Sequence, residues 1–453
     1  MANVCVNFDK TVGKIKPMHA VGQPPFTSGG GRLDFSPMQI LTDAHVPYSR
    51  LHDVGGAYAA NRYVDIPNIF RNFDADENDP ASYDFAFTDL LIEGMISHGV
   101  EPYFRLGVTI ENQCQIKAYR IHPPKDYGKW ARICEHIIRH YNEGWADGFY
   151  YNITYWEIWN EPDNTGDPKT NPMWTGTPKE YYQLYDVTAK HLKACFGDKI
   201  KVGGYAASTF NALFYEPEKY GLSITSKRYD TPEEFQRRKF RVDFFLGFVE
   251  YIKAHGSPID YFSWHAYGDI DVAPVISDFI DRVFTENGYA GLETHLNEWN
   301  LSHDREINLN NSRASASVAA MMITMQHKKT DMLMYYDAKY ISVSAYGGCY
   351  DVTTRKPSCI YYAIRAFGDL YALGNEVECK AEGEELYALA ARDGEKKAIL
   401  LSNRGEDKKL KLDIPDGFYV YLIDRDSLMV KTELNPKEFT LKGNTVALVK
   451  NFE

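Results

Sequence analysis

The amino-acid sequence predicts an α/β protein: a (β/α)8 TIM barrel followed by a C-terminal antiparallel β-sandwich. From about Lys16 to Leu370, eight short apolar or β-branched runs alternate with helical patterns. Their spacing leaves room for a strand and its crossover helix each time. After Leu370, short alternating runs are separated by glycine turns such as Asp393-Gly394, which is typical of antiparallel strands.

The predicted barrel strands are nearly continuous in apolar content, as in Tyr261-Phe262-Ser263-Trp264, which suits a parallel sheet buried on both faces. Eight consecutive units favour a closed barrel over an open doubly wound sheet. The eight expected strands are residues 17–22, 46–52, 100–107, 152–159, 200–206, 259–265, 292–297 and 331–337.

A helix is expected between Gly128 and Gly144, because apolar residues recur there at helical spacing. His136 and His140 share its polar face at the i,i+4 spacing of a zinc helix, but Ile137 stands where the metalloprotease pattern needs Glu. We therefore expect both histidines to be solvated and predict no metal site. The apolar stripe consists of Trp130, Ile133, Ile137, Ile138 and Tyr141.

The chain also opens with a strand-like segment, Val4 to Phe8. An isolated N-terminal strand would leave its backbone groups unpaired, so we expect this segment to join the C-terminal sheet. The predicted organisation is a catalytic barrel over residues 16–370 and an accessory β-sandwich formed by residues 1–15 and 371–453.

Composition excludes several classes of partner. The 453 residues carry 50 Lys and Arg against 62 Asp and Glu, a net charge of −12, which argues against nucleic acid and anionic membrane surfaces. No run of eighteen apolar residues is present, so no membrane span is expected. Aromatic residues reach 14%, which suits a protein that presents flat rings to a ligand.

The seven cysteines are scattered and form no C-x-x-C pair, which favours reduced thiols in the cytoplasm. The segment Met1 to Lys10 lacks the basic and apolar regions of a signal peptide. A secreted or periplasmic protein that has lost its signal peptide remains the alternative.

The most informative stretch is Tyr155 to Asp163, a predicted strand that runs into Asn160-Glu161-Pro162. Pro162 has no N–H to donate, so strand pairing ends there and Glu161 projects into the mouth of the barrel. Glu157 lies four residues back, about 13 Å down the strand, and is expected to be a hydrogen-bonded interior residue.

Glu298 occupies the corresponding position at the end of the seventh predicted strand. Two carboxylates that meet in an aromatic-lined mouth are what retaining glycoside hydrolysis needs, since one protonates the leaving oxygen and the other attacks the anomeric carbon. A separation of about 5–5.5 Å would specify retention. The negative charge of Glu298 is expected to raise the pKa of Glu161.

The chain resembles family 39 of the clan A glycoside hydrolases, which holds β-xylosidases and α-L-iduronidases. The resemblance implies that Glu161 is the acid/base and Glu298 the nucleophile. It further implies that Asn160 binds the hydroxyl beside the anomeric carbon. The similar motifs are Arg50–Asp53, Val100–Phe104, Glu157–Asp163, Ser263–Tyr267 and Asn297–Asn300.

For the remaining site residues, the resemblance places His265 and Tyr267 beside the nucleophile, and His52 and Asp53 at the non-reducing sugar. Trp299 either packs or stacks on a sugar face. On the eighth strand, Asp337 either binds sugar or pairs with Lys339. An iduronidase would need basic residues for a uronate carboxylate, and the sequence alone does not identify them.

Two insertions, residues 164–178 and 210–239, follow the fourth and fifth strands. They therefore lie at the end of the barrel where active sites sit. They either shape the substrate site or are variable loops without a function.

The predicted function is a retaining, exo-acting β-D-xylosidase that cleaves plant-type oligosaccharides without metal or organic cofactor. The alternatives are an α-L-arabinofuranosidase or arabinopyranosidase, an α-L-iduronidase-like enzyme, and a carbohydrate-binding barrel without catalysis. A metal-dependent barrel hydrolase would be seeded by His52, Asp53 and His265. The resemblance also suggests a homo-oligomer.

Overall fold

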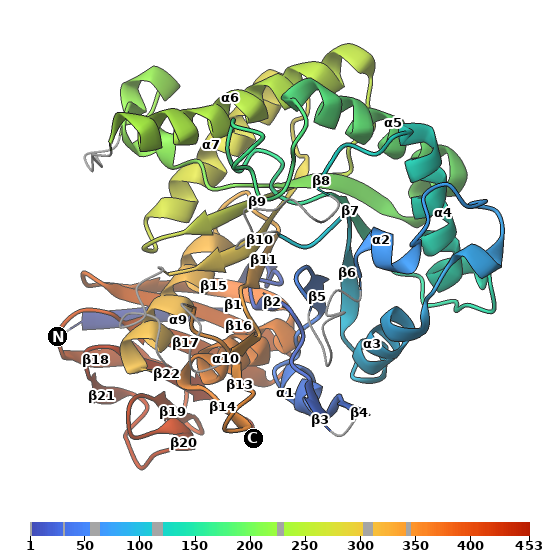
Figure 1. Ribbon diagram of the computed structural model, residues 1–453. Helices are drawn as coiled ribbons and strands as arrows, with labels where there is room; N and C mark the ends of the chain where they lie inside the picture. The colour runs from blue at the N-terminus through green and yellow to red at the C-terminus, as the bar shows by residue number, and fades with distance from the viewer. Residues whose placement is uncertain are drawn as a thin grey trace.

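The computed structural model describes residues 2–29, 32–54, 64–110, 121–223, 231–301, 311–340 and 346–453. A closed barrel ringed by helices carries a curled sheet on its flank (Figure 1). Helices α9 (Ser312–Gln326) and α10 (Cys359–Leu373) lie where the two parts meet (Figure 1).

The barrel contains eight parallel strands in the closed order β10-β11-β2-β5-β6-β7-β8-β9. Each lies in one of the eight ranges that the sequence predicts or extends slightly beyond it, so the predicted barrel is confirmed. The strands are β2 (Ala20–Gly22), β5 (Tyr48–Leu51), β6 (Glu101–Leu106), β7 (Tyr155–Ile158), β8 (Lys201–Ala207), β9 (Tyr261–Tyr267), β10 (Glu293–Asn300) and β11 (Met332–Tyr335).

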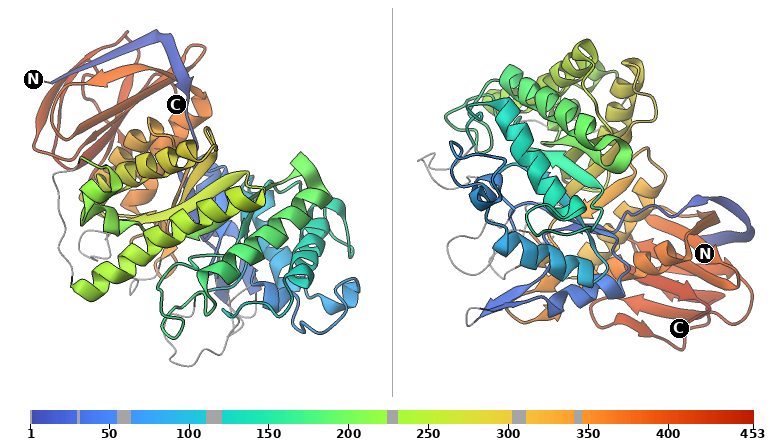
Figure 2. Two further views of the ribbon diagram at one scale, coloured as in Figure 1. Left: turned by 90° about the horizontal axis from the view of Figure 1, so that it is seen from above. Right: turned by 90° about the vertical axis from the view of Figure 1, so that its right-hand side faces the viewer.

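Helices surround the barrel, and Figure 2 shows α4, α5 and α6 side by side on its outer face. Sequence signals set their ends. Thr177 and Glu180 form a reciprocal capping box at the start of α5, and α4 ends at Gly144 with φ 73°. Besides α9 and α10, the helices are α1 (Gln39–Asp43), α2 (Ile66–Ile69), α3 (Ala86–Ser97), α4 (Tyr127–Glu143), α5 (Pro178–Phe196), α6 (Pro232–His255) and α7 (Val272–Glu286).

Helix α4 buries the predicted apolar stripe against the barrel. The expectation of two solvated histidines was wrong for His140, which is buried and stacked on Phe85 at a centroid distance of 3.6 Å. Its Nδ1 contacts the carbonyl of Trp145 at 2.8 Å and its Nε2 contacts Asp89 at 3.0 Å. Because both ring nitrogens are engaged, His140 is a satisfied core residue.

The C-terminal sheet contains nine strands and curls around a core of its own. The first strand, β1 (Ala2–Lys14), pairs antiparallel with β15 and parallel with β18, so the N-terminal strand joins this sheet as expected. The predicted boundary at residue 370 falls within α10. The remaining strands are β15 (Asn375–Ala381), β16 (Leu386–Asp393), β17 (Lys396–Asn403), β18 (Lys408–Asp413), β19 (Tyr419–Ile423), β20 (Leu428–Lys431), β21 (Glu438–Leu441) and β22 (Thr445–Lys450).

Two small sheets flank these parts. One pairs β3 (Thr27–Gly29) with β4 (Arg32–Asp34), and the other contains β12 (Lys339–Tyr340), β13 (Tyr350–Asp351) and β14 (Lys356–Pro357). Within the described ranges, none of the helices combines the length and apolarity needed to cross a bilayer.

Packing accounts for much of the aromatic content. Five tryptophans are fully buried, and their rings fill the space between the barrel strands and the surrounding helices. The expectation that the aromatic residues mainly present rings to a ligand was therefore wrong for tryptophan. The five are Trp156, Trp159, Trp174, Trp264 and Trp299.

Candidate active site

The sequence-predicted carboxylates meet at the C-terminal end of the barrel. Glu161 follows β7, and Glu298 lies near the end of β10. Glu161 has φ 42° and Trp159 has φ 74°, both in the left-handed region that non-glycine residues rarely adopt. Such strained backbone concentrates at functional sites, where the surrounding structure holds it in place.

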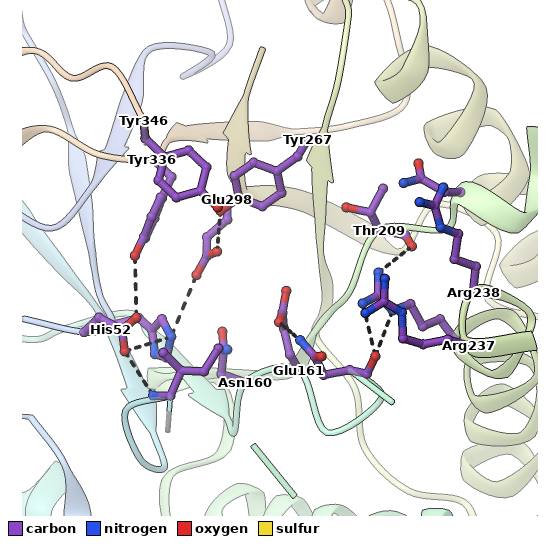
Figure 3. A pocket seen from close by; sticks show the side chains of 15 residues that line it. His52, Asn160, Glu161, Thr209, Arg237, Arg238, Tyr267, Glu298, Tyr336 and Tyr346 are labelled. Carbon is purple, nitrogen blue, oxygen red and sulfur yellow. Dashed lines mark hydrogen bonds and ion pairs between the residues drawn. The ribbon is translucent and has the colours of Figure 1, made fainter. Parts of the chain in front are cut away.

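A cavity of about 440 Å³ opens between these residues (Figure 3). Six of the sequence-predicted site residues line it: His52, Asp53, Asn160, Glu161, Tyr267 and Glu298. The other lining residues are Ile110, Asn164, Thr209, Asn211, Arg237, Arg238, Arg241, Tyr336 and Tyr346.

Glu298 is held by two donors, one from β5 and one from the neighbouring strand β9. Arg50 in β5 donates from Nη1 to Oε1 at 2.6 Å, and the Tyr267 hydroxyl donates to Oε2 at 2.8 Å. Hydrogen bonds from a charged donor are stronger than neutral ones, so these contacts fix the carboxylate and stabilise its negative charge. Glu298 is 6% exposed and lines the cavity.

Arg50 is fully buried and connects the site to the barrel interior. It also donates to Glu157 at 2.8 Å and to the side-chain oxygen of Asn160 at 2.6 Å. Asn297 donates to the second oxygen of Glu157 at 2.5 Å, which confirms that Glu157 is a hydrogen-bonded interior residue. Burial lowers the pKa of Arg50, but the charges of Glu157 and Glu298 raise it by more. Arg50 was part of a sequence motif, yet its role was not predicted.

Glu161 accepts hydrogen bonds from His265 Nδ1 and from Asn164 Nδ2, both at 2.7 Å. Burial raises the pKa of Glu161, but the hydrogen bond and charge of His265 outweigh it and lower that pKa to about 2. The expectation of a raised pKa was therefore wrong for the unliganded site. The expected rise in the pKa of Glu161 considered the charge of Glu298 but not the hydrogen bond from the imidazole of His265.

His265 stands between the two carboxylates. Its Nδ1 lies 3.5 Å from Oε2 of Glu298, and burial, which lowers its pKa, is outweighed by Glu298 and Glu161, which raise it. One carboxylate oxygen of Glu161 and one of Glu298 lie within 4.8 Å of each other and of this nitrogen. The pair Glu161–His265 therefore shares a proton beside the second carboxylate.

His52 lies across the cavity from Arg237 and Arg238 (Figure 3), and Asp53, which also lines the cavity, lies beside His52. Arg105 donates to His52 Nδ1 at 3.2 Å, so we assign the proton to Nε2, which lies 3.2 Å from Asp53 Oδ1. Burial and the charge of Glu298 raise the pKa of Asp53 to about 7. Burial together with Arg50 lowers the pKa of His52. Neutral His52 is thus an oriented donor.

Three tyrosines form a further wall that sequence reasoning only partly identified. The rings of Tyr267, Tyr336 and Tyr346 lie within 6.4 Å of one another, centroid to centroid. The Tyr336 hydroxyl lies 3.5 Å from Asp53 and accepts from Gln23 at 2.9 Å. Aromatic rings in this position offer flat apolar faces to a sugar.

Among the described residues, three of the predicted site residues are not part of the cavity lining: His265, Trp299 and Asp337. Trp299 is 1% exposed and packs edge-on against Tyr335 at 5.1 Å. Asp337 is half-buried, and burial together with the charge of Glu298 raises the pKa of its carboxyl. These positions favour the packing alternative for Trp299 and leave both alternatives for Asp337 as predictions.

Two groups of side chains have metal-ligand spacing within the described ranges: Glu161, His265 and Glu298 in the cavity, and a second group between α4 and α5. Neither contains His52 or Asp53. In the cavity group, Arg50, Tyr267 and Asn164 already satisfy three of the carboxylate oxygens, and His265 Nδ1 contacts the fourth. The second group consists of Glu135, His191 and Cys195.

A barrel that holds a histidine-bonded carboxylate and a second, arginine-bonded carboxylate at its C-terminal end is typical of the class of glycoside hydrolases. A model of the glycosyl hydrolases family 39 matches residues 61–339, more than half of the chain. The chain belongs to this family, and its substrate is a carbohydrate.

Individual relatives are distant. The chain is 22% identical over 389 residues to a β-xylosidase of Geobacillus stearothermophilus, covering 80% of this chain and 71% of that protein. A glucosidase from Croceicoccus marinus superimposes with a TM-score of 0.74 at 21% identity, over 99% of this chain and 98% of the other. A monomeric β-xylosidase from Caulobacter crescentus CB15 gives 0.67 at 15% identity, over 99% of both. At these identities the structural likeness establishes the fold alone.

Proposed function

We propose that this glycoside hydrolase is a retaining, exo-acting β-D-xylosidase that removes single sugars from plant-type oligosaccharides. The observation that carries retention is the distance between the carboxylates, whose nearest oxygens lie within 4.8 Å. Retaining enzymes hold the two groups about 5–5.5 Å apart, whereas inverting enzymes need room for a water between them.

In the first step, Glu298 attacks the anomeric carbon while Glu161 gives a proton to the departing oxygen. Arg50 and Tyr267 hold Glu298 by hydrogen bonds of 2.6 and 2.8 Å, so little reorganisation is needed during attack. The proton comes from the pair that Glu161 forms with His265 at 2.7 Å. When Glu161 contacts the glycosidic oxygen, the proton moves from His265 to Glu161 and on to that oxygen.

In the second step, water attacks the glycosyl-enzyme and Glu161 acts as the base. Once Glu298 is esterified it carries no negative charge. One of the charges that favours protonated His265 is then absent, so the pKa of the pair falls and Glu161 stays ionised, as a base that takes a proton from water must be. Asn160, fixed by Arg50 at 2.6 Å, is placed to bind the hydroxyl beside the anomeric carbon.

The xylose specificity is supported by the β-xylosidase relative at 22% identity. The alternatives are α-L-arabinofuranoside, α-L-arabinopyranoside and α-L-iduronide substrates. The test is a panel of nitrophenyl glycosides followed by proton NMR of the first-formed product. We expect the β-D-xyloside to give the highest kcat/KM and β-xylose to appear first. Release of α-xylose would contradict retention, and preference for another sugar would contradict the specificity.

We further propose that the protein is cytoplasmic. The six described cysteines are all free, which supports a reducing, cytoplasmic location; Cys114 lies outside the described residues. Homo-oligomer formation stays a prediction of the family resemblance. Sedimentation equilibrium of the purified chain tests it, and a single 51.8 kDa species at all concentrations would contradict it.

A further inference from the structure

Three arginines of α6 line one side of the active-site cavity: Arg237, Arg238 and Arg241 (Figure 3). Residues at these spacings lie on one face of a helix. Two of them belong to the insertion that follows the fifth strand. We call these three residues the arginine wall.

The arginine wall borders the acid/base. Asn164 donates from its side chain to Glu161 at 2.7 Å, and its carbonyl accepts two hydrogen bonds from Arg241, both at 3.1 Å. Figure 3 shows Arg237 and Arg238 on the Glu161 side of the cavity, across from His52. Since the acid/base contacts the glycosidic oxygen, groups beyond it face the leaving group.

The wall concentrates positive charge in an acidic protein of net charge −12. Arg237 is exposed, and within the described part of the chain no carboxylate pairs with it. Arg238 donates to the Tyr215 hydroxyl at 2.7 Å. Burial lowers the pKa of Arg241, the charges of Glu161 and Asp163 oppose this, and Arg237 and Arg238 lower it further. A bound anion would offset this mutual repulsion.

We propose that the arginine wall binds an anionic substituent, a carboxylate or a sulfate, on the sugar that leaves during the first step. The guanidinium group is suited to both, because its planar donors match two oxygens of an oxyanion at once. The preferred substrates are therefore acidic oligosaccharides in which the charged residue follows the scissile bond. This inference rests on the proposed hydrolysis of glycosidic bonds at Glu161 and Glu298.

The placement distinguishes this site from recognition of a uronate that is itself cleaved off. Such a carboxylate would lie with the non-reducing sugar, beside His52 and Asp53. There the charge of Glu298 already acts on Asp53 and raises its pKa, so a further negative charge is disfavoured. The arginine wall therefore favours a negatively charged group, whereas the end of the cavity at Asp53 disfavours one.

The experiment compares three disaccharides that share the sugar removed and differ in the second residue: neutral, uronic acid and sulfated. We expect higher kcat/KM for a charged second residue than for the neutral one, and a ratio that falls as ionic strength rises. Arg237→Gln should lower the charged-to-neutral ratio by about fivefold or more. Lys239→Gln is the matched control, since it removes one positive charge from the same helix at a residue that pairs with Asp243.

The uronic acid and sulfate substrates distinguish the two anions, because a preference for one alone identifies the group. Equal kcat/KM for all three disaccharides, or the same loss of ratio in Lys239→Gln as in Arg237→Gln, would overturn the proposal. Calorimetric binding of the same disaccharides to Glu298→Gln separates this result from failure of the proposed function. If no disaccharide is hydrolysed, the hydrolase assignment of this site fails, while tighter binding of the charged compounds would still support the arginine wall.

Discussion

His265 and Glu161 form a buried hydrogen-bonded pair in which Nδ1 of the imidazole lies 2.7 Å from Oε1 of the carboxylate. Burial acts against both charged forms, yet the net effect raises the pKa of His265 and lowers that of Glu161. The pair therefore holds one proton near neutral pH, and this proton is bound to the imidazole of His265.

Replacing His265 with Asn should move the alkaline limb of the pH profile of kcat/KM to lower pH by about one unit. In the native enzyme, the raised pKa of His265 keeps the pair protonated above pH 6.5, and activity falls as pH rises through that pKa. In the variant, Glu161 alone holds the proton. His136→Asn, on α4 outside the cavity, is the control. An unmoved alkaline limb would show that the imidazole does not share the catalytic proton.

Replacing Glu161 with Ala should affect substrates according to their leaving group. We expect kcat/KM to fall about 10³-fold for oligosaccharides, because general acid catalysis typically contributes this much. Dinitrophenyl glycosides, whose phenolate needs no proton, should retain most of their first-step rate. Stopped-flow release of the phenol separates the two steps, and added azide should restore turnover with retained configuration. Equal losses for all leaving groups would assign Glu161 another role.

Replacing Glu298 with Ala should remove the first step for every leaving group, with a loss of about 10⁴-fold or more. The cavity left by the side chain lies on the face opposite Glu161. Azide that enters there should give a glycosyl azide of inverted configuration, which NMR identifies. Near-normal hydrolysis of oligosaccharides by this variant would show that Glu298 is not the nucleophile.

The N-terminal strand should contribute to stability through its buried side chains. Val4 is 1% exposed and Val12 is 52% exposed, although both lie in β1. Val4→Ala should lower the free energy of unfolding by about 2 kcal/mol, since it removes two buried methyl groups and leaves a cavity. Val12→Ala should change it by less than about 0.5 kcal/mol. Urea titrations of both variants provide the measurement, and equal effects would contradict the role of burial.

The sequence predicts the barrel and its two carboxylates because both depend on local pattern. Apolar runs define the strands, and the C-terminal ends of parallel strands meet at one end of a barrel, so Glu161 and Glu298 had to approach each other. For Trp299, strand geometry alone could have excluded the alternative that its ring stacks on a sugar face. Successive side chains on a strand point to opposite faces, so Trp299 points away from the cavity that Glu298 faces.

Other site residues depend on contacts between distant parts of the chain. Arg50 and Glu298 are 248 positions apart, and the bond between them exists only because the barrel closes. The lowered pKa of Glu161 likewise requires His265, 104 positions away. The three arginines of the arginine wall lie within residues 237–241. Which face of α6 meets the cavity follows from packing.

The pairing of β1 with β15 imposes an order on biosynthesis. Lys14 bonds to Asn375, 361 positions further along the chain. The ribosome therefore exposes one edge of this ladder long before its partner exists, and during that interval β1 presents unpaired backbone groups. Barrel closure between β2 and β11 is subject to a similar delay. Folding of both parts is consequently a late event, because these strand pairs form only after the C-terminal residues have been synthesised.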